Sequence, residues 1–238
     1  MGSDGLDAPE RNARVSLPTE HQETREERLA RARQAVLEGD FPAGYAIYDV
    51  LLETSPNDAL VLREYGQARF AEYDDLEGAA QLFERALRAE PDSGPTMLWL
   101  ADVSSLGYGR GYDGAAALYR EVARLQPGEV DAYVGLGLLA RTPGEPVPVD
   151  EAVRAYRSAA EIDPRRVDAR ANLGMLLWER GQREEAKVAL SDALRLLSGP
   201  EQESRAATIR AALDAIERGE APAGTVRTND SPRLRWPE

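Results

Sequence analysis

The sequence contains no cysteine and a single histidine, His21. Without cysteine the chain can form neither disulfides nor thiolate metal sites, and its composition leaves the redox compartment open. One histidine, in a segment that we expect to be a flexible tail, cannot supply a Ser-His-Asp triad, histidine acid–base catalysis or a His/Cys metal cluster. We therefore expect no catalytic residue, no bound metal and no cofactor. An enzymatic alternative stays open only if a cofactor copurifies with the protein.

Long apolar runs are also missing. No stretch of about 18 apolar residues is present, so we expect no transmembrane helix and no membrane insertion. The N-terminal segment is acidic and lacks the apolar core of a secretory signal, so we expect a cytoplasmic protein. Lysine is nearly absent too, because Lys187 is the only one. Abundant arginine and alanine in its place are typical of GC-rich bacterial coding.

Positive charge is in deficit, and the formal net charge is −13. Residues 1–23 contribute a small share of it and residues 220–238 are balanced, so most of the negative charge lies between these two segments. An acidic surface repels phosphate backbones at long range, which disfavours nucleic acid as a partner. We expect a protein or peptide partner with a basic or neutral surface.

Residues 167–197 form one complete helix–turn–helix pattern. Gly174 belongs to the first helix, and Ala186, Leu190 and Ala193 follow in the second at steps of four and three, which place them on one helix face. The small residues allow two helices to approach closely. Such a unit cannot bury its apolar face alone, so it requires neighbouring units.

Four further copies of this pattern precede it. Their second helices end near prolines spaced by 35, 36 and 37 residues, namely Pro56, Pro91, Pro127 and Pro164. Each of these helices carries a small residue, an aromatic four residues later, and a small or aliphatic residue after three more. The four sets are Gly44, Tyr48, Leu51; Ala79, Phe83, Ala86; Ala115, Tyr119, Val122; and Ala152, Tyr156, Ala159. Recurrence at this period indicates a repeat architecture.

The first helices align on a pair of residues, of which the second is small. The pairs are Arg31-Ala32, Tyr65-Gly66, Leu100-Ala101, Leu136-Gly137 and Leu173-Gly174. With the A-x-x-x-F/Y-x-x-A second helix and the closing proline, the pattern resembles the tetratricopeptide repeat family. The first copy departs from it most, because Arg31 stands in place of leucine and Gly44 in place of alanine.

The resemblance implies an all-α, right-handed superhelical solenoid of five helix hairpins. We place the hairpins at residues 24–56, 57–91, 92–127, 128–164 and 165–198. A narrow apolar stripe predicts a C-terminal capping helix within residues 199–219, which would cover the last hairpin. Flexible tails are expected at residues 1–23 and 220–238. Extra residues in the third and fourth hairpins fall at 107–112 and 142–148, where we expect longer turns between helices.

Local capping signals refine the helix starts. Thr24 and Glu27 have the spacing of a capping box, in which each side chain satisfies a backbone donor of the other residue. Asp58 and Ser93 are suitable caps for the second and third hairpins. Gly219 is a suitable stop for the capping helix.

In arrays of this family the first helix of each hairpin typically lines the concave face. Carried over by position, the resemblance implies a partner-binding groove with arginines early in the array and apolar side chains late. The implied groove residues are Arg33, Arg63, Gln67, Phe70, Trp99, Asp102, Val134, Leu138, Asn172, Met175 and Trp178.

Two features of this set remain open. Trp99 and Trp178 either line the groove or pack between helices, and Trp178 could lie under the capping helix. For Leu138 and Met175 a core position is favoured.

The Lys/Asn/Arg set by which chaperone-binding members of the family hold a terminal carboxylate is missing, since Glu64, Trp99 and Val134 stand at its places.

These observations predict a non-catalytic scaffold or adaptor that holds a peptide or helix of a partner in the concave groove. An alternative is a regulatory subunit or self-associating structural protein that uses its end faces or tails.

Overall fold

The computed structural model describes residues 23–72, 75–142, 144 and 146–222. Within these residues it contains eleven α-helices and no strand, which confirms the all-α prediction. The helices are α1 (Arg25–Leu37), α2 (Phe41–Thr54), α3 (Ala59–Glu72), α4 (Leu76–Ala89), α5 (Gly94–Ser104), α6 (Gly111–Leu125), α7 (Val130–Leu139), α8 (Val149–Ile162), α9 (Val167–Glu179), α10 (Arg183–Leu196) and α11 (Glu203–Glu217). His21 and nearly all of both predicted tails lie outside the described residues.

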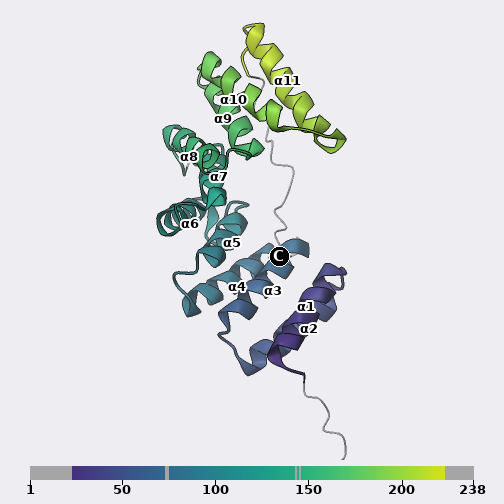
Figure 1. Cartoon of the computed structure of the whole chain (residues 1–238). Helices are drawn as coiled ribbons and strands as arrows, with labels where there is room; N and C mark the ends of the chain where they lie inside the picture. Colours follow the sequence, from purple (N-terminus) through teal and green to yellow (C-terminus); the bar gives the residue numbers. More distant parts are fainter. Residues whose placement is uncertain (1–22, 73–74, 143, 145, 223–238) are drawn as a thin grey trace, which may run out of the picture.

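The first ten helices pair into five antiparallel hairpins. In each hairpin an odd-numbered first helix packs on the even-numbered second helix that follows it, and each second helix packs on the next first helix. Figure 1 shows the hairpins following one another along an arc from α1 to α11. The first helices α3, α5, α7 and α9 also contact one another in sequence, whereas the second helices are separated by the first helix between them. The arrangement is a helical solenoid.

Glycine allows the helices of a hairpin to pack closely. A Cβ atom built on Gly66 of α3 would lie 2.7 Å from the Phe83 ring of α4. One built on Gly174 of α9 would lie 2.6 Å from Leu190 of α10. Contacts this short do not occur between ordinary side chains, so any larger residue would push the helices apart. The small residue of the repeat pattern is therefore a packing requirement.

The capping box at the start of α1 is present as predicted. Thr24 Oγ1 accepts from the Glu27 backbone N–H at 3.2 Å, and a Glu27 carboxylate oxygen accepts from the Thr24 N–H at 2.7 Å. Asp58 also acts as predicted, because it accepts from the Val61 N–H at the start of α3. Ser93 differs, since its hydroxyl bonds to the Thr96 hydroxyl instead of a backbone donor.

The capping helix α11 packs on α9 and α10. It begins at Glu203, slightly later than the sequence suggests, because a short 3₁₀ turn from Pro200 to Gln202 precedes it. Its buried face contains Ala206, Ile209 and Ile216, as the apolar stripe predicts, and its opposite face is exposed. No helix in the described part of the chain combines the length and the apolarity needed to span a bilayer.

Candidate functional site: the first-helix face

The direct contacts between successive first helices define one side of the solenoid. Because these helices approach one another while the second helices stay apart, the array bends with the first helices on its inner side. Figure 1 agrees, since α6 and α8 lie on the outer side of the arc. We call the inner side the first-helix face. It is the face on which the sequence placed a partner-binding groove.

Five of the implied groove residues, all on first helices, are partly accessible to solvent. They are the half-buried residues Arg33, Arg63, Trp99, Asp102 and Leu138. They come from α1, α3, α5 and α7, so the accessible part of the set spans the first four hairpins. Arg63 forms no ion pair with another described residue. Its guanidinium is therefore available to an acceptor from outside the chain.

The other six implied groove residues are buried, which corrects the expected groove position of four of them, whereas a core position was already favoured for Met175 and the position of Trp178 was left open. They are Gln67, Phe70, Val134, Asn172, Met175 and Trp178. The physical reason is the close contact between neighbouring first helices, which encloses side chains that point toward the next hairpin. Met175 therefore belongs to the core, as the favoured interpretation had it, whereas Leu138 is only half-buried.

Trp178 lies beneath the end of the capping segment. Its side chain is 5% exposed, and its indole N–H donates to the backbone carbonyl of Glu220 at 3.3 Å. This hydrogen bond ties α9 to the chain that leaves α11. Of the two positions that the sequence left open for Trp178, the structure shows the packed one.

Trp99 combines both of its expected positions. Its ring packs edge-on against Phe70 of α3, with centroids 5.6 Å apart, and stacks on Phe83 of α4 at 6.2 Å. The side chain is nevertheless only partly buried. Trp99 thus closes the core between the second and third hairpins, and part of its side chain stays accessible to solvent.

Charged pairs connect successive hairpins along this face. Arg33 of α1 binds the buried carboxylate of Glu64 of α3 with two hydrogen bonds. Arg141 and Glu179 pair at 3.0 Å between the α7 and α9 hairpins. The hydrogen bond to Glu64 raises the pKa of the Arg33 guanidinium, although partial burial opposes it. These arginines are already engaged within the chain.

A third pair lies at the start of α9. Arg166 donates to Asp131 of α7 at 2.6 Å and to Asp168 at 2.7 Å. The sequence interpretation missed Asp131, Arg141, Arg166 and Glu179. One signal could have identified them, because the partners are 35 and 38 residues apart, about one repeat period. Opposite charges at that spacing fall on neighbouring hairpins.

Acidic side chains on several first helices have partners within the chain itself. No group of three or more His, Asp or Glu side chains among residues 23–72, 75–142, 144 and 146–222 is arranged to hold a metal ion. Several carboxylates of the first helices are instead bound to arginine or tyrosine. Asp102, for example, accepts from the Tyr119 hydroxyl at 2.6 Å.

The fold and this face define a class of protein, the helical-hairpin solenoid, in which stacked repeats present an extended surface to a partner. Residues 149–213 match the family model described as tetratricopeptide repeat. The five hairpins carry the same pattern in register, and the matched segment spans α8, α9, α10 and most of α11. No curated protein matches the chain in sequence.

Solved structures share this fold. A crystal structure of MamA aligns with a TM-score of 0.63 at 21% identity and covers 73% of this chain and 96% of that one. MamA from Desulfovibrio magneticus RS-1, residues 41 to the end, has a TM-score of 0.64 at 18% identity, covering 72% and 93%. YrrB, described as a TPR protein with an unusual peptide-binding site, has a TM-score of 0.62 at 22% identity, covering 79% and 94%.

Proposed function

We propose that the protein is a non-catalytic scaffold or adaptor that holds a peptide or helix of a protein partner on the first-helix face. The observation that carries this proposal is the partly exposed Trp99 of α5, near the middle of the array, with Arg63 on the preceding first helix, which forms no ion pair with another described residue. Tryptophan and arginine are the residue types most enriched in binding hot spots. The description of YrrB, a protein of the same fold, as peptide-binding supports the same class of partner.

The partner's chemistry follows from the charges on this face. Arg63 is free to bind an acidic side chain or a carbonyl, whereas Arg33 is engaged by Glu64. A segment that places an apolar side chain against Trp99 and an acceptor near Arg63 would complement both. The rest of the partner is expected to be neutral or basic, because the chain as a whole carries a net charge of −13. The expected cytoplasmic location stays a prediction.

Two variants test the proposal once a partner has been captured and purified. Trp99→Ala should weaken the complex by about 2 kcal/mol or more, the loss typical of a tryptophan hot spot. Arg63→Glu should also weaken it, while leaving the melting temperature close to wild type. Arg88→Glu, a charge reversal at an exposed residue of α4, serves as the matched control and should leave affinity unchanged.

Affinity and melting temperature must be measured on the same preparations. Trp99 packs on two phenylalanines, so its replacement also lowers stability, and only Arg63→Glu separates binding from folding. Unchanged affinity in both variants would remove the binding site from the first-helix face. Self-association of the purified chain in sedimentation would favour the alternative of a self-associating structural protein.

A further inference from the structure

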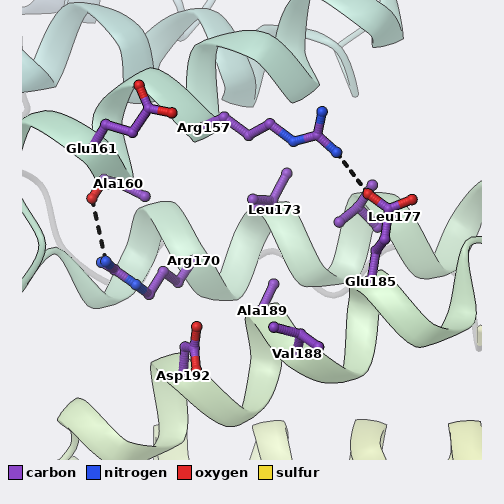
Figure 2. A pocket seen from close by; sticks show the side chains of 10 residues that line it. All are labelled: Arg157, Ala160, Glu161, Arg170, Leu173, Leu177, Glu185, Val188, Ala189 and Asp192. Carbon is purple, nitrogen blue, oxygen red and sulfur yellow. Dashed lines mark hydrogen bonds and ion pairs between the residues drawn. The ribbon is translucent and has the colours of Figure 1, made fainter.

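A hollow lies on the outer side of the solenoid, away from the first-helix face, between the second helices α8 and α10. Its floor is α9, with Leu173 and Leu177, and its volume is about 410 Å³. Figure 2 shows the side chains of the two flanking helices on either side of this floor. We call it the α8–α10 groove. It shares no residue with the accessible part of the first-helix face.

The repeat register explains why this groove is hollow. Three residues after the small residue of each second helix, the five hairpins carry Ile47, Leu82, Leu118, Ala155 and Ala189. Leu82 and Leu118 are buried, and Leu82 lines the corresponding groove between α2 and α4, where the volume is about 280 Å³. The fourth and fifth hairpins carry alanine here, and at Ala189 that aliphatic volume stays unfilled, so the larger groove lacks a side chain that the first three hairpins provide themselves.

One residue at the rim of the groove is aliphatic, whereas the other hairpins carry a small or polar residue at the equivalent position. Val188 of α10 lines the groove and is 63% exposed. The same register position holds Ala46, Gln81, Ala117 and Arg154 in the other hairpins. An exposed aliphatic rim beside an unfilled aliphatic floor is an arrangement that gains free energy when another apolar group covers it.

At one end of the groove, Arg170 has a hydrogen-bond donor that lacks an acceptor. Its Nη2 donates to the backbone carbonyl of Ala160 at 3.2 Å, but its Nη1 is buried and has no acceptor among the described residues. A buried donor without an acceptor is unfavourable, so an oxygen from a ligand would stabilise it. Toward the other end, Arg157 and Glu185 already pair across the groove at 2.7 Å and need no further partner (Figure 2).

We propose that the α8–α10 groove docks a segment of a partner protein that inserts a leucine or isoleucine side chain over Leu173, Leu177 and Ala189. A carbonyl or carboxylate oxygen of the same segment accepts from Arg170 Nη1. The aliphatic anchor is specified by the register, because leucine or isoleucine occupies the equivalent place in the first three hairpins. This site goes beyond the proposed function, since it lies on the outer face and does not involve Trp99 or Arg63.

The decisive variant fills the groove from within. Ala189→Leu supplies the side chain that the second and third hairpins carry at this position, so we expect it to fold and to block the site. Ala117→Leu adds the same side chain at an exposed position of α6 and is the matched control. The probe is a set of immobilised short synthetic peptides with polar flanks and a central leucine, isoleucine, alanine or lysine, tested against the purified full chain.

We expect the wild-type chain to bind the leucine and isoleucine peptides, and not the alanine or lysine peptides. Ala189→Leu should lower that binding about tenfold or more, which corresponds to at least about 1.4 kcal/mol. Ala117→Leu and Arg63→Glu should leave it unchanged. The last comparison separates this site from the first-helix face, so either proposal can fail without the other.

Three results would overturn the proposal. One is equal binding of all peptides, or binding of none. Another is unchanged peptide binding by Ala189→Leu, with the fold verified by circular dichroism. If that variant fails to fold, Val188→Asp at the exposed rim replaces it, and unchanged peptide binding by that variant would overturn the proposal in the same way. The third is a wild-type dimer that Ala189→Leu converts to a monomer in light scattering, which would make the occupant a second copy of the chain.

Discussion

Arg33 and Glu64 join the first two hairpins through a charged pair whose carboxylate is buried and whose guanidinium is half-exposed. The Arg33 Nε–H donates to Glu64 Oε2 at 2.8 Å, and a second N–H donates to Oε1. The Glu64 side chain is 6% exposed, against 42% for Arg33. Glu64 therefore depends on this pair more than Arg33 does, because its carboxylate has little access to water and Arg33 supplies its hydrogen bonds.

Removing Arg33 should accordingly destabilise the protein. We expect Arg33→Ala to lower the free energy of unfolding by about 1–3 kcal/mol, because it leaves a buried carboxylate without its hydrogen bonds. Chemical denaturation measures the change. The double variant Arg33→Ala/Glu64→Gln should recover part of the loss, because the uncompensated charge is gone; strict additivity of the two single changes would contradict the coupling.

Ala159 tests the small-residue packing that the repeat pattern predicts. It is fully buried, so Ala159→Leu should overpack the contact and lower the free energy of unfolding by about 1–3 kcal/mol. Ala221→Leu, at an exposed position after α11, receives the same side chain as a control and should have little effect. Thermal melts compare the two. Equal melting temperatures would show that Ala159 is not at a close contact.

Gly181 ends α9 in a conformation that favours glycine. Its φ is +77°, its N–H donates to the carbonyl of Trp178, and the next N–H, of Gln182, donates to that of Leu177. This is the Schellman arrangement. Gly181→Val should lower the free energy of unfolding by about 1–2 kcal/mol, the cost of a left-handed backbone for a side chain with a Cβ. The control is Gly128→Val, because Gly128 has open space and no positive φ; a similar loss there would refute the conformational explanation.

The pair of Arg120 and Glu151 predicts a modest acid dependence. Arg120 binds both carboxylate oxygens of Glu151 at 2.7 and 2.9 Å, and these hydrogen bonds lower the pKa of Glu151. A lowered folded-state pKa means that the stabilisation is present above the ordinary value of 4.5 and is lost as the pH falls through the lowered one. Both side chains reach solvent, so the effect should stay below about 1 kcal/mol.

Glu151→Gln isolates this contribution. The variant should be less stable than wild type at neutral pH, and the difference should shrink as the pH falls below 4.5. Denaturant midpoints across that range measure it. A difference that is independent of pH would assign the effect to packing of the side chain.

The sequence by itself determined the architecture of this protein. The small–aromatic–small order of the second helices recurs at a nearly constant period, and the structure shows that the large residue of this order packs against the small residue of the first helix, since Gly66 lies directly against Phe83 and Gly174 against Leu190. Local signals succeeded for the same reason. The Thr24 capping box and the apolar stripe of α11 depend on residues three or four positions apart, and that distance is fixed by the helix itself.

Tertiary structure alone decided which side chains reach solvent on the first-helix face. Position within a repeat does not state how closely the next hairpin approaches, so Val134 was expected in a groove and is buried in the core, and the open position of Trp178 was decided only by the packing. The same applies to the pairing of Arg33 with Glu64 and to the unfilled groove at Ala189. Each depends on the distance between elements that are far apart in the chain, and that distance is set by the packing of the whole array.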